Sequence, residues 1–552
     1  MRTLWLTALC LAALVTTSLF AFSAWPTFGG DPGRTGYTAE TPTVPMSTLW
    51  KFYYPDPQND TTPAVENGRV YFAAQNWLFC LDLDSGARRW EFDAKVPIRT
   101  SPLISGDDVI FGDNYSLLHA LDKTTGKSRW EVDLEGAILS APLIYEGKLY
   151  VGVTSKKVVA LNPATGKALW TYTTDRPVSL PLAAAGGLIF ALEKGGTIYA
   201  LNAATGKLTW KATSEAALSV PPVASKDVLY LVSGKILYGL SLRGAKMWNA
   251  RSDRPLDHAP VVVGETLYMT GSDARLYAMK ARSGAIKWIV DEPGILFTTS
   301  PLVAGKVIFI GGSEGTIAAL AADTGKLLWR CQTRSLNSPL NSPGSQSAAT
   351  QPVYSDGKLL VLYNDGNLTC FSPKAADMSG PVIDQVGPSG RVVSGELPIA
   401  VRAHIFDEGS GLDPASIAAY FDGEKGNMVQ DPISGSYFYI LTGKKPKETV
   451  ADGVHTVSVT AKDYRGNATT VAWRFGTDKE IPVETRLIPE ALAGLLRLQS
   501  GGRSPYGTTS GAYGATGSQG QGFRGGSSSG GGSSGGGSRG GGGRGGGGRR
   551  GG

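Results

Sequence analysis

The stretch A-L-N-P-A-T-G-K-A-L-W, residues 160–170, decides the fold of this chain. It is typical of a β-hairpin, because the apolar end of one strand is followed by a polar turn and then by a second strand that carries Trp170. Gly166 provides the positive φ angle that such turns require. Trp170 is a large apolar residue, so we expect the second strand to pack against another part of the molecule.

The same unit recurs about every 40 residues, and in seven copies a glycine stands four residues before a tryptophan. Trp50 lies in similar surroundings, L-W-K-F, but no hairpin precedes it. We therefore expect Trp50 to lie on an outer strand that the N-terminal part of the chain supplies. The tryptophans are predicted to pack between neighbouring units rather than to bind a cofactor. They are Trp50, Trp90, Trp130, Trp170, Trp210, Trp248, Trp288 and Trp329.

A second pattern supports the repeat independently. A hydroxyl residue stands two positions before a proline once in nearly every unit, as at Thr100 and Pro102, and three apolar runs and the hairpin follow. Residues 350–371 make only three strands and have no tryptophan, so we expect the strand around Trp50 to complete that unit. Eight four-stranded units in a ring without free edges predict an all-β fold with an eight-bladed β-propeller over residues 46–375.

The T-G-K turn with its tryptophan resembles the quinoprotein-type (PQQ-like) propeller repeat, over residues 25–372. That family contains quinoprotein dehydrogenases and non-catalytic, BamB-like proteins. The resemblance to the enzymes implies a PQQ cofactor, a Ca²⁺ ion, an aspartate base and a disulfide between adjacent cysteines. Here the cysteines stand alone at positions 10, 80, 331 and 370, and the blades are nearly minimal. We therefore expect no PQQ and no catalytic residue. A PQQ-dependent dehydrogenase of alcohols or sugars is the alternative.

A second domain is predicted over residues 381–477, where the tryptophan repeat stops and strands with alternating apolar and polar residues begin. The segments D-E-G-S-G-L-D-P-A-S-I (407–417) and D-G-V-H-T-V-S-V-T-A-K-D-Y-R-G-N (452–467) resemble bacterial immunoglobulin-like modules, which implies a small β-sandwich. Carboxylates of this domain can gather oxygens for a Ca²⁺ ion. The alternative is that they only hold the backbone of turns. The candidate ligands are Asp407, Glu408, Asp413 and Asp463.

The ends of the chain carry features of an exported protein. Residues 1–24 contain an arginine, a long apolar run and small residues at their end, which is typical of a secretory signal peptide; an uncleaved anchor is the alternative. A turn-rich lead-in, residues 25–45, follows. Residues 478–500 are predicted to form a linker with a short helix, and residues 501–552 a disordered tail rich in glycine, serine and arginine. We expect the protein in the periplasm, at the cell surface or outside the cell.

The net charge of +6 comes from the tail. The chain has 53 Lys and Arg against 47 Asp and Glu, and the tail carries six arginines and no acidic residue. The rest of the chain is therefore neutral, and we expect no nucleic-acid partner. The tail is predicted to act as a spacer or to contact acidic surfaces.

One group of residues at the rim of the propeller is a candidate binding site. Arg254, Asp257 and His258 occur together in D-R-P-L-D-H-A-P, where His258 replaces the usual hydroxyl residue. Arg99 and Arg176 are expected to approach the same rim, and an insertion at residues 335–349 lengthens a loop on that face. These features predict a recognition patch for an acidic or peptide ligand; a solvated rim with ion pairs is the alternative. The sequence as a whole predicts an exported, non-catalytic binding or scaffold protein whose partner is a protein or a surface polymer.

Overall fold

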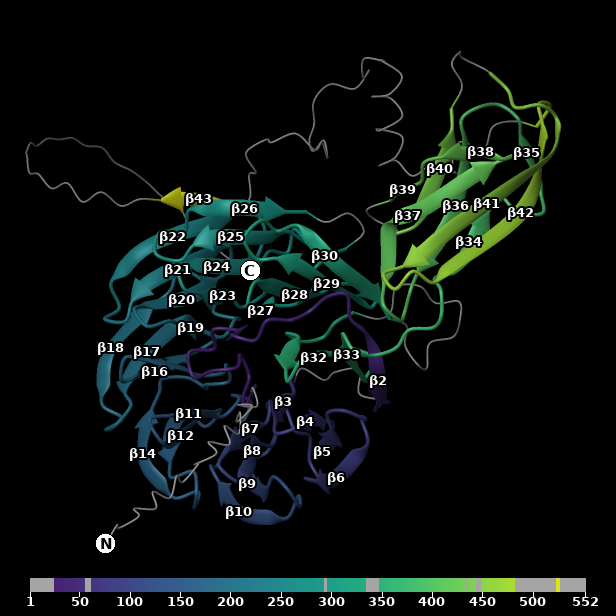
Figure 1. The fold of residues 1–552 in the computed structure, drawn as a ribbon. Helices are drawn as coiled ribbons and strands as arrows, with labels where there is room; N and C mark the ends of the chain where they lie inside the picture. The colour runs from purple at the N-terminus through teal and green to yellow at the C-terminus, as the bar shows by residue number, and fades with distance from the viewer. Residues whose placement is uncertain are drawn as a thin grey trace, which may run out of the picture.

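The computed structural model describes residues 24–54, 61–291, 295–333, 347–431, 435–442, 448–481 and 523–526. These residues form strands, turns and loops without a helix. The sheets are arranged around a ring, with a second domain beside it (Figure 1). The predicted all-β propeller fold is therefore confirmed. Among the described residues, no helix is long and apolar enough to span a membrane.

Each sheet of the ring is built from strands that follow one another in the sequence. The first four sheets comprise β3 (Ala64–Glu66), β4 (Arg69–Ala74), β5 (Trp77–Asp82) and β6 (Arg88–Asp93); β7 (Leu103–Ser105), β8 (Asp108–Gly112), β9 (Leu117–Asp122) and β10 (Ser128–Asp133); β11 (Leu143–Tyr145), β12 (Lys148–Val153), β13 (Lys157–Leu161) and β14 (Ala168–Thr173); and β15 (Ala183–Ala185), β16 (Leu188–Leu192), β17 (Thr197–Asn202) and β18 (Leu208–Thr213).

The next four sheets continue the pattern, with one exception in the last. They comprise β19 (Val223–Ala224), β20 (Val228–Ser233), β21 (Ile236–Ser241) and β22 (Lys246–Ser252); β23 (Val261–Val263), β24 (Thr266–Thr270), β25 (Leu276–Lys280) and β26 (Ile286–Val290); β27 (Leu302–Ala304), β28 (Val307–Gly311), β29 (Thr316–Ala321) and β30 (Leu327–Gln332); and β31 (Val353–Ser355), β32 (Lys358–Leu362), β33 (Asn367–Ser372) and β2 (Ser47–Tyr53).

The exception closes the ring. The outer strand of the eighth sheet is β2, which comes from the N-terminal part of the chain and pairs antiparallel with β33, so that Trp50 lies opposite Cys370. The first and last parts of the ring thus share one sheet, which closes the ring.

The pattern of apolar residues follows from the position of each strand. In the third sheet, β12 and β13 are buried except for their first residues, whereas the outer strand β14 alternates between exposed and half-buried positions. Strands covered on both faces need continuous apolar runs, and a strand at the outer edge needs only every second residue. This is why the inner strands are marked by apolar runs and the outer strands by a single tryptophan.

Each of these tryptophans except Trp329 packs on the turn of the next sheet. Trp130 Nε1 donates to the carbonyl oxygen of Pro163 at 3.1 Å, and a Cβ atom added to Gly166 would come within 2.7 Å of the Trp130 ring. Glycine is therefore required both for its positive φ of 67° and for its lack of a side chain. The same bond joins Trp50 to Leu83, Trp90 to Lys123, Trp170 to Ala203, Trp210 to Leu242, and Trp248 to Ala281.

The lead-in after Ala24 runs around the inside of the ring. It bonds to the innermost part of all eight sheets in turn, from Trp25, which pairs with Val65, to Glu40, whose carboxylate accepts the N–H groups of Asp356 and Gly357. Between these points, β1 (Tyr37–Thr38) pairs parallel with β27. The other contacts are Pro26 with Ile104, Thr27 with Pro142, Pro32 with Ala184, Gly33 with Ala224, Thr35 with Val262, and Gly36 with Val303.

Arg34 is the centre of this lead-in. It is 3% exposed, and all five N–H groups of its guanidinium donate to protein oxygens. Burial lowers the pKa of Arg34 to about 9, so the side chain is charged at neutral pH. The acceptors are Leu182 O, Thr27 Oγ1, Phe28 O, Ala141 O and Pro142 O.

The second domain consists of two sheets packed face to face. Side chains of both sheets, among them Val401 and Val459, share one core with Trp473. One sheet comprises β34 (Val382–Gly387), β36 (Ile399–Phe406), β40 (Tyr437–Leu441) and β39 (Val429–Gln430). The other comprises β35 (Val392–Ser394), β42 (Ala468–Asp478), β41 (Gly453–Asp463), β37 (Leu412–Phe421) and β38 (Glu424–Gly426). The assignment to immunoglobulin-like modules stays a prediction.

Several predicted features lie outside the described residues. They are the signal peptide up to residue 23, most of the insertion 335–349, the short helix in the linker 478–500 and most of the tail. Within the tail, β43 (Phe523–Gly526) pairs with β22 as a fifth strand of the fifth sheet. The expectation of a tail without regular structure therefore does not hold for these four residues.

Candidate metal centre at the joint between the domains

The joint between the propeller and the second domain begins at Trp329. Its Nε1 has no turn of the eighth sheet to bond to, because the fourth strand of that sheet is β2 and no hairpin connects it to β33. Instead, Trp329 donates to the carbonyl oxygen of Ser410 at 2.6 Å. A Cβ atom added to Gly411 would lie 2.0 Å from the carbonyl oxygen of Arg330. The loop 407–411 of the second domain thus takes the place of the missing turn.

The same loop also bonds to β2. Thr48 N donates to Gly409 O at 3.0 Å, and the Thr48 hydroxyl donates to Glu408 O at 2.7 Å. Lys51 forms a salt bridge with the Glu408 carboxylate at 3.1 Å. The loop therefore contacts the outer strands of the seventh and the eighth sheets, at the place where the ring is closed by two distant parts of the chain.

A small cleft lies at the joint and is lined by residues of both domains. Arg330 lines this cleft and donates to Gln430 at 3.0 Å and to the Tyr437 hydroxyl. Cys331, which lines the same cleft, is 1% exposed and lies against the carbonyl oxygen of Asp407 at 3.5 Å. Burial raises the pKa of the Cys331 thiol, with a further contribution from Asp407.

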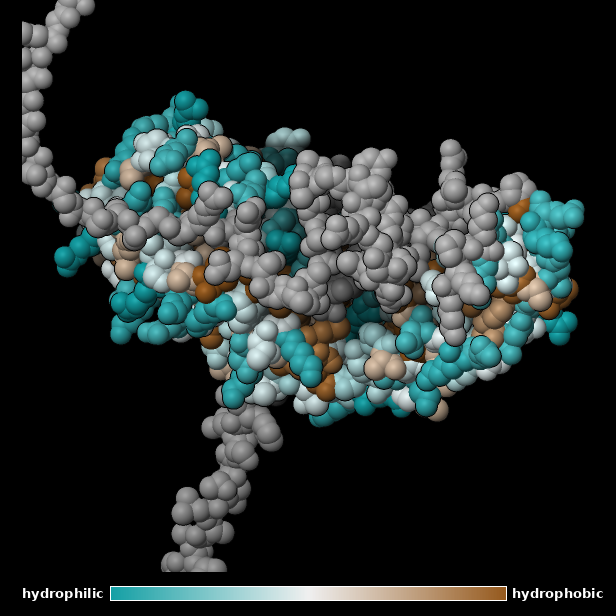
Figure 2. Space-filling view, turned by 90° about the horizontal axis from the view of Figure 1, so that it is seen from above, coloured by the Kyte–Doolittle hydropathy of each residue, from teal (hydrophilic) through white to brown (hydrophobic). Residues whose placement is uncertain are grey.

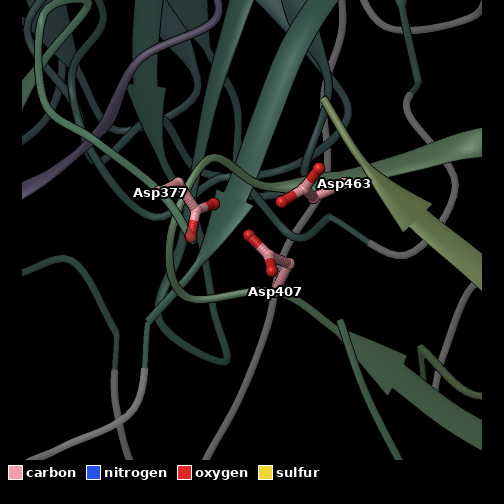
Figure 3. Close-up of side chains that lie close together, drawn as sticks. All are labelled: Asp377, Asp407 and Asp463. Atoms are coloured by element: carbon pink, nitrogen blue, oxygen red, sulfur yellow. The ribbon is translucent and has the colours of Figure 1, made fainter. Parts of the chain in front are cut away.

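Three carboxylates meet beside this cleft. Asp377 follows the propeller, Asp407 begins the loop 407–411, and Asp463 ends β41, and their side chains point toward one another (Figure 3). One oxygen atom of each lies within 4.8 Å of one oxygen of each of the others. Asp407 and Asp463 are each 2% exposed, and Asp377 is half-buried. Among the described residues, this is the group of His, Cys, Asp or Glu side chains that is close enough to hold a metal ion.

Hydrogen bonds fix the direction of each carboxylate. Asp407 Oδ1 accepts the N–H groups of Gly409 at 3.0 Å and Gly411 at 2.7 Å. Asp377 Oδ2 accepts Ser410 N at 2.6 Å, and a Cβ atom on Gly409 would lie 2.3 Å from the same oxygen. Only glycine at position 409 therefore allows the Asp377 carboxylate to approach the loop this closely.

Asp463 is held in the same way by its own turn. Its Oδ1 accepts the N–H groups of Arg465 at 2.9 Å and Asn467 at 2.8 Å, and its Oδ2 accepts the Asn467 side-chain amide at 2.6 Å. The same amide nitrogen also donates to the backbone oxygen of Asp377 at 3.1 Å. The turn 463–467 thus connects Asp463 to the segment that carries Asp377.

Asp407 is the carboxylate whose charged form this arrangement disfavours. Burial, together with the neighbouring charges of Asp377 and Asp463, raises the pKa of Asp407 to about 7 against the opposing effect of its backbone hydrogen bonds. For Asp377, burial raises the pKa, but hydrogen bonding from Ser410 and Ser379 outweighs it and the pKa is lowered. The Ser410 hydroxyl is fully buried and faces the Asp377 carboxylate, but it lacks good hydrogen-bond geometry to any atom of the described residues.

The structure brings together two of the four predicted calcium ligands. Asp407 and Asp463 lie in the cluster, whereas Glu408 pairs with Lys51 and Asp413 accepts Ala415 N at 3.0 Å within a turn. Asp377 was not among the predicted ligands. It stands in A-A-D-M-S-G between the two domains, where the sequence contains neither a repeat nor a loop motif.

The predicted rim residues lie on loops that lead into different sheets. Arg99 precedes the second sheet, Arg176 the fourth, and Arg254, Asp257 and His258 the sixth, so a whole sheet separates each loop from the next. His258 is largely buried, and its Nε2 donates to Thr298 O at 2.8 Å. Arg176 is exposed, and its backbone N donates to the buried Glu193 at 2.7 Å. The five residues therefore do not form one compact cluster.

The fold of the ring is shared with proteins of known structure. Quinohemoprotein alcohol dehydrogenase ADHIIG from Pseudomonas putida HK5 is 14% identical over 65% of this chain and 81% of its own, with a TM-score of 0.52. The enzyme from Comamonas testosteroni is 15% identical over 66% and 82%, with a TM-score of 0.52. BamB from Moraxella catarrhalis is 20% identical over 59% and 99%, with a TM-score of 0.49. No curated protein matches the chain.

The repeats themselves match a protein family. The family described as outer membrane protein assembly factor BamB, whose model is called PQQ_2, matches residues 47–178, 154–243 and 235–378. Together these matches span residues 47–378, which is more than half of the 552 residues. The chain therefore belongs to the BamB family of PQQ-like β-propeller repeat proteins.

Proposed function

We propose that this protein is an exported, non-catalytic scaffold that binds a protein or surface-polymer partner on the rim of its propeller. The observation that carries the proposal is the lead-in 25–40, which runs around the inside of the ring and bonds to all eight sheets. A ring whose sheets are joined by its own chain in this way is a rigid platform, and its outer faces remain for a partner. Membership of the BamB family is in keeping with this role.

The alternative is a PQQ-dependent dehydrogenase of alcohols or sugars, since enzymes of that kind share the fold. PQQ is a planar tricarboxylate that needs cationic donors and room. At the inside of the ring the buried cation is Arg34, and its five N–H groups are already used by protein oxygens. Cys80, Cys331 and Cys370 are buried and free, and they lie on strands of the first, seventh and eighth sheets. The use of these five donors by the protein itself favours the scaffold over a PQQ-dependent enzyme.

The loops that lead into the sheets are the candidate contact surface. They carry Arg99, Arg176 and Arg254, and the last two are exposed. On the face that Figure 2 shows, hydrophobic residues occur in small groups among hydrophilic ones. An interface that presents these arginines suits a partner that is recognised by charge and hydrogen bonds and is released again. The basic tail adds charge of the same sign.

The first experiment separates the scaffold from the enzyme. The full chain is purified from the exported fraction, incubated with PQQ and Ca²⁺, desalted, and examined by absorption spectroscopy and by dye-linked oxidation of alcohols and sugars. We expect neither retained quinone nor turnover. A retained quinone with turnover would refute the scaffold and would favour the dehydrogenase.

The second experiment tests the rim. A photoreactive residue is placed at position 254 and, as a control, at position 167 in an exposed turn of the third sheet. Crosslinking is carried out in intact cells. A defined adduct at position 254 that is lost in an Arg99→Glu/Arg176→Glu background is expected, without an adduct at position 167. Equal adducts at both positions, or none at position 254, would contradict a rim binding site.

A further inference from the structure

We propose that Asp377, Asp407 and Asp463 bind a divalent cation of the calcium class that fixes the second domain to the propeller. The proposal goes beyond the scaffold function, because it concerns the joint rather than the rim. It also replaces the ligand set expected from the sequence with one that spans the linker and two loops.

The geometry of the three carboxylates is that of a preformed oxygen site. Their side chains converge from three separate segments, and backbone N–H groups hold at least one oxygen of each in place. A carboxylate oxygen has lone pairs for both an N–H group and a cation, so these hydrogen bonds orient the ligands without using them up. Three carboxylates at this distance repel one another, and a cation between them relieves this repulsion.

The Ser410 hydroxyl is a second, independent sign of a ligand. Ser410 is fully buried, and its Oγ atom, which faces the Asp377 carboxylate, has no hydrogen-bond partner among the described residues. A buried hydroxyl without a partner is costly. A cation held by the carboxylates, together with the water that completes its coordination, supplies a partner at this position.

The donor set favours calcium over other divalent ions. All the candidate ligands are oxygen atoms, and no His or Cys side chain belongs to the described cluster. Zinc prefers nitrogen and sulfur ligands, and magnesium requires a small, nearly ideal octahedron. Calcium accepts six to eight oxygens in flexible geometry, and modules outside the cell bind it with Kd values of about 10⁻⁴–10⁻³ M.

The cation would act on the joint through the loop 407–411. The carboxylates of Asp377 and Asp407 both accept hydrogen bonds from backbone N–H groups of this loop. The loop in turn accepts hydrogen bonds from the propeller: Ser410 O from Trp329 Nε1, and Gly409 O from Thr48 N. A ligand that pulls the three carboxylates together therefore also stabilises the contact between the loop and the propeller. The binding site and the mechanical joint share the same residues.

Binding is measured on the full chain after treatment with EDTA and exchange into metal-free buffer. Calcium is titrated by calorimetry, and terbium(III) is titrated as a luminescent probe that Trp329 sensitises. We expect one site with a Kd of about 10⁻⁴–10⁻³ M. An at least tenfold loss of affinity is expected for Asp463→Asn and for Asp377→Asn. The matched control Asp413→Asn removes a nearby acidic group outside the cluster and is expected to bind as the wild type does.

Three outcomes would overturn the proposal. The first is the absence of both terbium luminescence and binding heat with calcium up to 10 mM, on the order of ten times the weakest expected Kd. The second is binding that survives in the Asp377→Asn/Asp463→Asn double variant. The third is an equal affinity for magnesium, which would refute the calcium class. Circular dichroism of each variant tests whether it is folded, so that a loss of cation binding can be distinguished from a loss of structure.

The effect on the joint needs a separate readout. Cys331 is shielded by the backbone of the loop 407–411, whereas Cys80 lies inside the first sheet. Labelling of Cys331 by a thiol reagent is expected to be at least tenfold slower in calcium than in EDTA, and labelling of Cys80 is expected to be unchanged. Equal Cys331 rates in calcium and EDTA would refute the clamp even if a cation binds.

Discussion

At the level of single residues, the glycine of the repeat is as decisive as the tryptophan. The spacing of these two residues is visible in the sequence, so the packing of each tryptophan between sheets could be predicted. The partner could not be, because the Nε1 bond of Trp130 reaches Pro163, 33 residues away in the next sheet. Any residue type can accept a hydrogen bond through its backbone oxygen, so the sequence does not identify the acceptor.

Two glycines of the third sheet test this packing. Gly166→Ala places a Cβ atom 2.7 Å from Trp130, whereas Gly147→Ala meets no atom within 4 Å, and both glycines have a φ near 70°. The strained φ costs about 1–2 kcal/mol in each variant. Overpacking adds about 1–3 kcal/mol for Gly166→Ala alone. Unfolding in urea measures the difference, and equal losses of stability would show that the tryptophan tolerates the added methyl group.

His258 gives a prediction about pH. Burial lowers the pKa of His258 from 6.5, with hydrogen bonding to Thr298 O opposing the shift. The unfolded chain therefore binds a proton below about pH 6.5 while the folded chain does not, and stability is lost as the pH falls from 6.5 toward the folded pKa. His258→Thr, which restores the hydroxyl of the repeat, should remove this part of the slope. Urea unfolding between pH 5 and 7 tests it, and identical slopes for the two proteins would contradict it.

At the level of elements, the lead-in is the largest departure from what the sequence indicates. The segment 25–45 contains many turn residues and, apart from β1 and the bridge at Trp25, is irregular in the structure as well, but the sequence gives no sign of its contacts with all eight sheets. Its glycines have a structural reason: Gly33 allows the chain to approach Ala224 O, where a Cβ atom would lie 2.1 Å from that oxygen. The contacts join a short segment to backbone groups spread from Val65 to Gly357. No periodicity can reveal contacts of this kind.

The contribution of the lead-in to the stability of the ring can be tested at Arg34. Arg34→Met leaves buried carbonyl oxygens without donors, and we expect a loss of roughly 3–5 kcal/mol. Arg34→Lys should recover only part of it, because an ammonium group has three donors instead of five. Arg88→Met is the control, since Arg88 is exposed and pairs only with Glu91, and a change within about 0.5 kcal/mol is expected. Equal effects at both positions would mean that the lead-in does not stabilise the ring.

The loop 407–411 shows how a candidate site can be half predicted. Its acidic residues led to the prediction of a calcium site. The third carboxylate of the cluster comes from Asp377, however, and Glu408 forms a salt bridge with Lys51 instead. Proximity in the fold, not proximity in the sequence, selects the members of the cluster. The loop can be the partner of Trp329 because β2, from the N-terminal part of the chain, provides the fourth strand of the eighth sheet. No local sequence motif indicates this arrangement.

Two glycines of the second domain test the contact of this loop. Gly411→Ala would bring a Cβ atom 2.0 Å from Arg330 O, whereas Gly423→Ala meets no atom within 4 Å, and their φ angles are 89° and 88°. Gly411→Ala should loosen the joint while both domains stay folded, and Gly423→Ala should leave it intact. Small-angle scattering would show a larger radius of gyration for Gly411→Ala alone. The same radius for both variants would exclude the loop as the joint.

At the level of the whole molecule, the ring and the second domain differ in how they are held. The ring is held by eight sheets, a lead-in that contacts all of them and a closing strand. The joint is held by the loop 407–411, the salt bridge of Lys51 with Glu408, the contacts of Arg330, a hydrogen bond from Arg465 to Ser47 and the packing of Tyr464 against the propeller core. We expect this smaller set of contacts, with a cleft beside it, to open at a lower free energy than a sheet with a buried core.

The order of thiol exposure follows from this difference. Cys331 at the joint, Cys80 in the first sheet and Cys370 in the eighth are all buried and free. Variants that retain one of the three are labelled with a thiol reagent at increasing urea concentrations. Cys331 should react below the unfolding transition of the ring, whereas Cys80 and Cys370 should react only within it. Simultaneous exposure of all three thiols would mean that ring and second domain unfold as one cooperative unit, and the joint would then be as strong as the ring itself.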